Sequence, residues 1–334
     1  MNAMHAMPVT PLLLGPLLAS ARLGRGRTLL VCCCAAALGL AVGAGDGDLA
    51  SARFGTEYGG LLLGCAVAPC LARHRTSLEA ALAQAREVAR STQQLILRPI
   101  SRDLVGIHVC TRYHCAAAES AVGGDVYDAA ATPYGLRVLV GDVRGHGLEA
   151  LRLSAATVAA FRELAYTTPD LPALVTDLDK RLAPQLEAED FVTAVLAEFA
   201  PGEVRLVNCG HPAPVRAGRS VELLEPLAPV PPLGLNPDPR QYRVRLQPGD
   251  RLLLYTDGLT EARSPDGTLF PLLPEAARAL REPLPDDALD HLYARLVAHT
   301  GARPADDLAL VLCQPSQASA PVTAVTHSHR SGCS

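Results

Sequence analysis

Gly141-Asp142-Val143-Arg144-Gly145-His146-Gly147 places one carboxylate at the end of an apolar run and follows it with a glycine-rich turn. The run predicts a strand over 136–140, and the apolar spacing after the turn predicts a helix over about 148–166. Gly145 and Gly147 permit backbone angles that a side chain disfavours. An aspartate followed by glycine after a strand is usually only a turn or a helix cap. The other acidic motifs of the chain decide between a cap and a functional site.

The composition indicates a chain with a substantial core and no broad basic surface. Of the 334 residues 49% are hydrophobic, and the formal net charge is −4. That charge excludes an extended nucleic-acid interface. Lys180 is the one lysine among 30 basic residues, a bias that we attribute to a GC-rich genome, so the many arginines are not evidence for phosphate binding.

The ten cysteines show no paired spacing, and three of them are adjacent at 32–34 in an apolar run. We therefore expect reduced thiols that serve as small core residues rather than disulfides. A zinc site is suggested by four residues that lie close together on a predicted strand: His108, Cys110, His114 and Cys115. Because a strand sends neighbouring side chains to opposite faces, we do not expect zinc there.

The N-terminal region, residues 1–75, contains two uncharged apolar runs at 29–44 and 59–72. Each is short for a bilayer core of about 30 Å, which needs about 20 helical residues. Arginines precede the first run and follow the second, which predicts a membrane hairpin with both ends in the cytoplasm. The alternatives are a secretory signal or single anchor that ends near 42–44, or a soluble apolar segment. The hairpin is favoured because export would expose free cysteines to oxidation.

Residues 76–100 are predicted to form a linker helix that ends before Pro99. Its apolar positions make a short heptad seam that would allow a weak coiled coil and a homodimer through 76–97. The alternative is an amphipathic helix that packs on the following domain. The seam consists of two rows: Leu78, Ala85 and Thr92, and Leu82, Ala89 and Ile96.

Four acidic motifs follow residue 101 in similar surroundings, each beside glycine or at the end of an apolar run. They are Gly123-Gly124-Asp125, Asp142, Asp257 and Asp306-Asp307. Carboxylates at several strand ends can converge on one edge of a β-sandwich. Mg²⁺ and Mn²⁺ prefer such oxygen ligands, and two ions about 3.5–4 Å apart can acidify a water and neutralise a phosphoryl group. Without cations the clustered carboxylates would repel one another, so convergence would nearly require metals.

In these motifs the chain resembles the bacterial SpoIIE/RsbU branch of the PPM (PP2C-type) serine/threonine phosphatases. The matching pieces occur in the family's order and are therefore more specific than any single motif. They are GGDVYD at 123–128, GDVRGHGLEA at 141–150, FVTAVLAEF at 191–199, NCGHPAP at 208–214, PLGL at 232–235, GDRLLLYTDGLTEAR at 249–263 and DDLALVL at 306–312.

The resemblance implies an α+β fold over 101–314, a four-layer α/β/β/α sandwich of two antiparallel sheets flanked by helices. Hydrophobic patterning agrees with mixed α and β structure. It predicts strands near 105–113, 136–141, 191–199, 204–209, 221–224, 242–247, 252–256 and 308–313, and helices near 148–166, 170–184 and 285–299. The polar tail, 315–334, is predicted to be disordered.

The resemblance also implies a site with two divalent cations, Mn²⁺ or Mg²⁺. Asp142 would bridge both ions, and the main-chain carbonyl of Val143 would be a further ligand. Asp257 and Asp306 would complete the shell of one ion, with Asp307 as the alternative to Asp306. Asp125 would serve the other ion. The implied reaction is direct attack by metal-bound hydroxide, without a phosphoenzyme.

Two further side chains near Asp142 are candidates for a catalytic and a substrate-binding role. His146 has an ordinary pKa near 6.5 and is suited to act as a general acid, or it only shapes the turn. Arg144 is placed to meet the substrate phosphate, although the arginine bias weakens that argument. The family commonly has Trp after GGD where this chain has Val126. That change removes no ligand.

The function implied by the resemblance is hydrolysis of phosphoserine or phosphothreonine on a protein, with an anti-sigma-factor antagonist as the substrate. The expected location is the cell membrane, with the catalytic domain in the cytoplasm. A non-enzymatic alternative is a membrane-tethered pseudophosphatase that binds a regulatory partner. A GGDEF-type diguanylate cyclase is disfavoured because Val126-Tyr127 replaces Glu-Phe.

Overall fold

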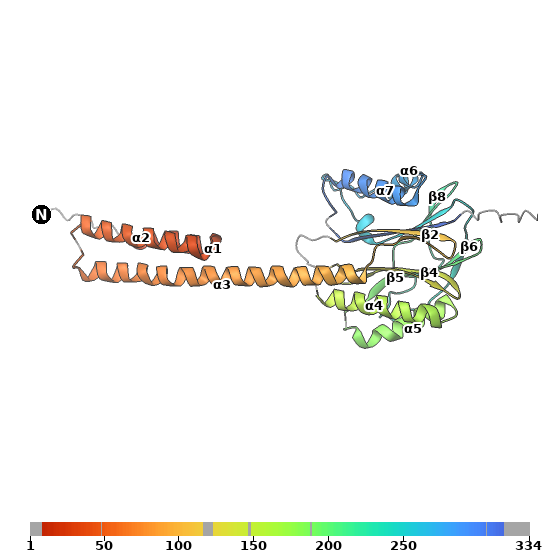
Figure 1. The fold of residues 1–334 in the computed structure, drawn as a ribbon, viewed down its shortest axis with the longest axis horizontal. Helices are drawn as coiled ribbons and strands as arrows, with labels where there is room; N and C mark the ends of the chain where they lie inside the picture. The colour runs from red at the N-terminus through yellow and green to blue at the C-terminus, as the bar shows by residue number, and fades with distance from the viewer. Residues whose placement is uncertain are drawn as a thin grey trace, which may run out of the picture. The chain divides into compact units, whose positions relative to one another are not determined.

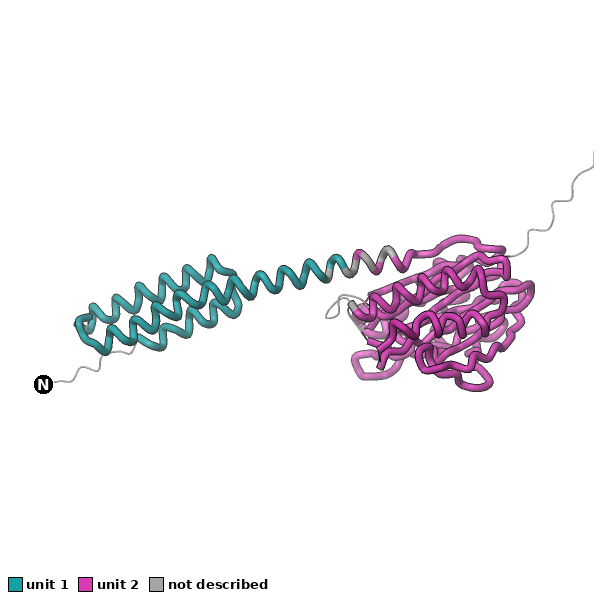
Figure 2. Tube along the Cα trace, turned by 90° about the horizontal axis from the view of Figure 1, so that it is seen from below, with its two compact units in different colours: residues 1–88 teal, residues 89–334 magenta. Residues whose placement is uncertain are grey.

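The computed structural model describes residues 9–47, 49–115, 123–145, 148–187, 189–304 and 306–316. Its contacts divide the chain into two units, residues 1–88 and residues 89–334 (Figure 2). The expectation of a disordered tail after 315 lies almost wholly outside the described residues. The expected limit of the domain at 314 is close to the end of the last strand, Pro315.

Unit 1 is helical and contains both apolar runs. After a short 3-10 turn at Thr10–Leu13, its helices are α1 (Leu14–Arg22), α2 (Arg25–Gly45) and α3 (Ala52–Ile96), of which α3 continues into unit 2. The second apolar run and the predicted linker helix are thus parts of one helix. The residues that join them, 73–76, are polar and favour or tolerate helix, so the helix does not end between the two parts.

Small residues bring the helices of unit 1 together. A Cβ atom at Gly43 would lie 2.3 Å from the ring of Phe54, and one at Gly64 would lie 2.0 Å from a methyl carbon of Leu13. The Tyr58 hydroxyl donates a hydrogen bond to the Ala36 carbonyl across the hairpin, at 3.2 Å. Close approach through glycine is typical of helices that pack in a membrane.

Two helical segments of the described chain are long and apolar enough to cross a membrane. They are Arg25–Gly45, with a mean hydropathy of 2.1, and Ala52–Ala85, with a mean hydropathy of 1.2. Several of their leucines point outward, including Leu30 and Leu63. Signal sequences and buried core helices share this length and composition, so the membrane hairpin stays a prediction. The homodimer through 76–97 also stays a prediction, although Leu78 and Leu82 are exposed.

Unit 2 contains two antiparallel sheets with helices, as predicted. The six-stranded sheet has the order β1-β2-β11-β10-β7-β8, and the five-stranded sheet has the order β3-β4-β5-β6-β9. The strands are β1 (Ser101–Leu104), β2 (Ile107–His114), β3 (Asp125–Thr132), β4 (Gly135–Val143), β5 (Val192–Ala200), β6 (Glu203–Cys209), β7 (Val215–Ala217), β8 (Val221–Leu223), β9 (Tyr242–Arg245), β10 (Arg251–Tyr255) and β11 (Leu308–Pro315).

Helices cover the outer faces of the two sheets (Figure 1). The five-stranded sheet carries α4 (Leu148–Thr167) and α5 (Leu171–Leu182), and the six-stranded sheet carries α6 (Leu272–Ala279) and α7 (Pro285–Thr300). Strand β11 shows how alternation builds two cores. Ala309, Val311 and Cys313 join one hydrophobic cluster, and Leu308, Leu310 and Leu312 join the other.

The structure corrects several predicted elements. The strand expected from 105 begins at Ile107, because Val105 and Gly106 have φ of 51° and 76° and form the turn of the β1–β2 hairpin. Strands β1, β3 and β7 and helix α6 were not predicted. In β3 the alanines at 129–131 conceal a strand, since alanine has a low β-propensity.

Candidate active site and metal centre

Strands β3 and β4 place two of the predicted ligands side by side. Asp125 lies directly opposite Asp142 in the antiparallel register, so their side chains share one face of the sheet with Cβ atoms about 4.5–5.5 Å apart. The Val143 N–H donates to the Gly124 carbonyl at 3.1 Å and extends the pairing by one step. The pair therefore lies where β3 begins and β4 ends, at the end of these two strands that is remote from the β3–β4 turn.

The six-stranded sheet brings the other acids to the same end. Asp257 begins a 3-10 turn (Asp257–Leu259) that is separated from β10 by Thr256 alone, and Asp306 and Asp307 precede β11. Because Tyr255 of β10 pairs with Leu310 of β11, the end of one strand lies beside the start of the other. A Cβ atom at Gly258 would lie 1.9 Å from the Asp307 carbonyl oxygen, so only glycine permits this approach.

Thr256 joins the two sheets at the site, a role that the sequence did not reveal. Its hydroxyl donates to Asp125 Oδ2 at 2.8 Å and accepts from the Ala309 N–H at 2.9 Å. A second connection runs from the Gly124 N–H to Asp307 Oδ2, at 3.2 Å. The acids of both sheets are thus held in one arrangement by hydrogen bonds between the sheets.

The electrostatics show that the aspartates converge. Asp125 is only 1% exposed, and burial followed by the charge of Asp142 raises its pKa well above the usual value. Burial, followed by the charges of Asp257, Asp306 and Asp307, raises the pKa of Asp142 to about 7. Burial and then the Asp306 charge also raise the pKa of Asp257. The ionised forms need a compensating cation, because buried like charges destabilise one another.

Two glycines leave room beside these oxygens. A Cβ atom at Gly124 would lie 2.4 Å from the Val143 carbonyl oxygen and 2.8 Å from Asp142 Oδ1. A Cβ atom at Gly123 would lie 2.1 Å from Asp307 Oδ2. The donor set, carboxylates with one carbonyl, is the chemistry that Mg²⁺ and Mn²⁺ prefer. The residues present therefore fit hard divalent cations.

The remaining predicted site residues lie apart or are outside the description. Arg144 is directed to the segment after α5: its guanidinium donates to the Glu189 carbonyl at 2.6 Å and lies 5.4 Å from the centre of the Phe191 ring. The structure therefore does not place its side chain among the acids. His146 lies outside the described residues, so both interpretations of it stay open.

Two buried polar side chains support the site from behind. His211 lies between Thr193 Oγ1, at 2.9 Å, and the Tyr255 carbonyl, at 3.0 Å, and burial lowers its pKa to about 3. It is thus a neutral bridge between the two sheets. Gln93, in the last turn of α3, donates from Nε2 to the Gly123 carbonyl at 3.1 Å. A glutamine within the predicted linker helix gives no sequence signal for such a contact.

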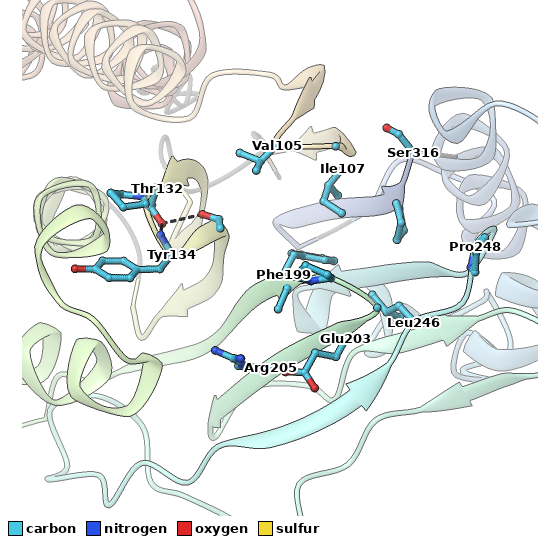
Figure 3. A pocket seen from close by; sticks show the side chains of 17 residues that line it. Val105, Ile107, Thr132, Tyr134, Phe199, Glu203, Arg205, Leu246, Pro248 and Ser316 are labelled. Atoms are coloured by element: carbon cyan, nitrogen blue, oxygen red, sulfur yellow. Dashed lines mark hydrogen bonds and ion pairs between the residues drawn. The ribbon is translucent and has the colours of Figure 1, made fainter. Parts of the chain in front are cut away.

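A large cavity lies at the end of unit 2 that is opposite the acidic cluster, and Figure 3 shows the side chains that line it. Its volume is about 810 Å³, and its lining includes Thr132 and Tyr134 from the β3–β4 turn and Phe199 from the end of β5. Asp125 and Asp142 lie at the other ends of β3 and β4. The cavity is therefore separate from the acidic cluster.

Comparison with known proteins agrees with this geometry. The sequence profile of the family described as stage II sporulation protein E (SpoIIE) matches residues 132–315, more than half of the chain. The RsbU and RsbW domains of Rv1364c from Mycobacterium tuberculosis are 27% identical with a TM-score of 0.54, and the match covers 65% of this chain and 61% of that one.

Two further solved structures share the fold. The SiaA-PP2C domain of Pseudomonas aeruginosa is 22% identical with a TM-score of 0.61, covering 72% of this chain and 99% of that one. The PP2C phosphatase domain of SpoIIE from Bacillus subtilis, with a fragment of its regulatory domain, is 15% identical with a TM-score of 0.52, covering 64% of each chain. The match thus spans less than two thirds of the mycobacterial and Bacillus chains. The chain belongs to the SpoIIE family and carries a PP2C-type (PPM) serine/threonine phosphatase domain.

Proposed function

We propose that the full chain is a divalent-metal-dependent protein serine/threonine phosphatase. The observation that carries this proposal is the convergence of buried Asp125 and half-buried Asp142 from one sheet with Asp257, Asp306 and Asp307 from the other. A protein that only binds a partner has no need to keep such a repulsive cluster. Membership of the family supports the same activity.

The acids divide into two groups around Asp142. Burial and then the Asp306 charge raise the pKa of Asp257, whereas burial, the Asp142 charge and then the charges of Asp307 and Asp257 raise the pKa of Asp125. We assign Asp306 to the ion shared by Asp142 and Asp257, and Asp307 to the side of Gly124 and Asp125. On that side Asp307 accepts the hydrogen bond of the Gly124 N–H, or it serves as an alternative metal ligand. The Val143 carbonyl supplies a further oxygen beside Asp142.

The chemistry of the site follows from these positions. Divalent cations, when bound, would acidify a water molecule and neutralise the charge of the phosphoryl group. Thr256 holds Asp125 in place through its hydroxyl. We keep His146 as the candidate proton donor to the leaving serine or threonine oxygen. Arg144 would need to leave Glu189 in order to meet the substrate phosphate.

Hydrolysis of p-nitrophenyl phosphate by the full chain in detergent tests the activity. We expect no turnover in EDTA and recovery with Mn²⁺ or Mg²⁺, because the charge of the phosphoryl group needs compensation. The pseudophosphatase alternative predicts no turnover with any metal. Turnover of equal rate with and without metal would contradict the metal-dependent mechanism.

The proposed substrate is a phosphoserine or phosphothreonine on an anti-sigma-factor antagonist. Two observations support it: the resemblance to the SpoIIE/RsbU branch, and a relative in which RsbU and RsbW domains were solved together. The small net charge of −4 leaves a protein surface, rather than a nucleic acid, as the partner.

We also propose that α2 and the first part of α3 form a membrane hairpin that leaves the phosphatase domain in the cytoplasm. Their length, their mean hydropathy and their outward leucines support it. Full-length protein is expected to stay in the membrane pellet during alkaline carbonate extraction. Release into the supernatant would favour a soluble helical unit, and N-terminal cleavage on export would favour a signal sequence.

A further inference from the structure

A second group of metal-ligand side chains lies in the six-stranded sheet. The His108 imidazole, the Cys110 thiol and the Asp286 carboxylate offer ligand atoms that all lie within 4.8 Å of one another. In the part of the chain that the structure describes, no other three His, Cys, Asp or Glu side chains meet this distance. Two of the residues come from β2 and the third from the first turn of α7.

The fold brings these groups together in a way that the sequence did not show. His108 and Cys110 are two residues apart on one strand, so both side chains point to the face covered by α7. Asp286 is distant in sequence and completes the group. His114 is instead 3.4 Å from the Tyr293 hydroxyl, and the Cys115 thiol interacts with Asp307 at the acidic cluster.

The outer partners of a metal site are also in place. His108 Nε2 lies 3.0 Å from Asp286 Oδ2, and His108 Nδ1 lies 3.2 Å from Asp103 Oδ1. The Ser101 hydroxyl donates to Asp286 Oδ1 at 2.7 Å. In metal sites a ligating histidine commonly donates its other ring N–H to a carboxylate, and ligating carboxylates accept further hydrogen bonds. Asp103 and Ser101 are positioned for these two tasks.

The three side chains differ in burial, so that the site is closed at Cys110 and open to solvent at His108 and Asp286. Cys110 is 1% exposed, and the side chains of His108 and Asp286 are 26% and 48% exposed. An ion can thus enter from solvent between the imidazole and the carboxylate and reach the thiol. A water molecule can occupy the open fourth position, as in other zinc sites with three protein ligands.

The group is separate from the acidic cluster. His108 pairs with Gln314, whereas His114, six residues further along β2, pairs with Leu308 beside Asp307. At about 3.3 Å per residue the two places are on the order of 20 Å apart along the strand.

We propose that His108, Cys110 and Asp286 form a zinc site that fastens the start of α7 to the β1–β2 hairpin, with Asp103 orienting the imidazole. Mixed sulfur, nitrogen and oxygen donors suit zinc, whereas Mg²⁺ and Mn²⁺ prefer oxygen alone. The two sites would therefore select different metals in the same domain.

Cobalt(II) is the probe for this site in the full chain, with excess Mg²⁺ present to occupy the oxygen ligands. We expect a thiolate-to-cobalt absorption band in the near ultraviolet, which one equivalent of Zn²⁺ abolishes. Cys110→Ala is expected to remove the band, and His108→Gln to weaken cobalt binding without the risk of disturbing the core. Asp103→Asn should weaken binding by about 10- to 100-fold, the usual effect of losing an outer partner.

Cys313→Ala is the matched control, because Cys313 is an equally buried thiol on the paired strand β11 but belongs to the other hydrophobic cluster. Both Cys313→Ala and Asp142→Asn are expected to keep the band. Absence of the band in the unmodified chain would mean that His108 is only paired with two carboxylates. A band that survives Cys110→Ala, or an unchanged cobalt affinity in His108→Gln, would place the metal elsewhere. Each of these results would overturn the proposal.

Discussion

Asp142→Asn is expected to lower the metal-dependent hydrolysis rate of the full chain by about 100-fold or more. Asp142 faces Asp125 across the β3–β4 pair and is close enough to Asp257, Asp306 and Asp307 for their charges to raise its pKa. Removing its charge therefore affects both groups of acids. Lewis-acid stabilisation of a phosphoryl group supplies several kcal/mol, and about 1.4 kcal/mol corresponds to a tenfold change in rate.

The same substitution is expected to make the metal-free protein more stable. The amide occupies the volume of the carboxylate and removes a negative charge directly opposite Asp125, where like charges are unfavourable. The gain is expected to reach up to about 1 kcal/mol. Thermal unfolding in EDTA measures it as a higher melting temperature. A purely structural aspartate would give the opposite sign, so the paired measurements identify a metal ligand.

Asp128→Asn is the matched control because it neutralises an aspartate of the neighbouring strand β3 that lies outside the cluster. Asp128 accepts a hydrogen bond from Arg162 at 2.6 Å on the side of α4. We expect its rate to stay close to that of the unmodified chain. An Asp142→Asn variant that keeps more than a tenth of the rate would contradict the central role of Asp142.

The inactive Asp142→Ala chain should also retain a phosphoprotein partner. The enrichment of that phosphoprotein with the variant tests the proposed substrate class.

The acids could be predicted from the sequence because each follows or precedes an apolar strand within a few residues. The family resemblance, which rests on the order of motifs, implied the two sheets, whereas periodicity predicted only mixed α and β structure; most elements lie within three residues of the expected ranges. Asp125 was expected in the acidic cluster, where the structure places it, although its strand was not predicted, because the glycines beside it provide the signal. The Gly123-Gly124-Asp125 motif thus indicated a functional position in a segment where β-propensity predicted no strand.

Contacts between distant segments could not be predicted. The Thr256 hydrogen bond to Asp125 joins residues 131 positions apart, and no local pattern encodes such a pair. The proposed choice between Asp306 and Asp307 rests on the neighbours of each carboxylate, which only the fold supplies. The zinc ligands show the same limit, since Asp286 is 178 positions from His108.

Arg137→Met is expected to destabilise the phosphatase domain by about 3–5 kcal/mol. The Arg137 side chain is 0% exposed and lies within β4, in the same strand as Asp142. Its guanidinium forms hydrogen bonds of 2.8 and 2.6 Å with Glu198 Oε2. It also donates to three main-chain carbonyls where α4 ends, those of Ala165, Thr168 and Pro169.

The size of this effect follows from what the substitution leaves behind. Glu198 would remain buried with a charge that only Arg205, at 2.9 Å, still compensates. The three carbonyls would lose their donors, and each unsatisfied buried group costs about 1–3 kcal/mol. Arg137→Lys keeps the charge but cannot replace the planar fork, so it should recover only part of the loss.

Amide hydrogen exchange of the full chain measures this loss without requiring reversible unfolding. Protection of the β4 and β5 amides is expected to fall by about two to three and a half orders of magnitude in Arg137→Met, since about 1.4 kcal/mol corresponds to a tenfold change. Arg205→Met is the matched control, because it removes the half-exposed partner of the same carboxylate and should cost less than about 1 kcal/mol. Equal losses in both variants would show that the Glu198 charge alone matters. A loss in Arg137→Met that is smaller than predicted would mean that water molecules donate hydrogen bonds to the carbonyls at the end of α4. Arg137 would then not be the residue that fixes α4 to the sheet of Asp142.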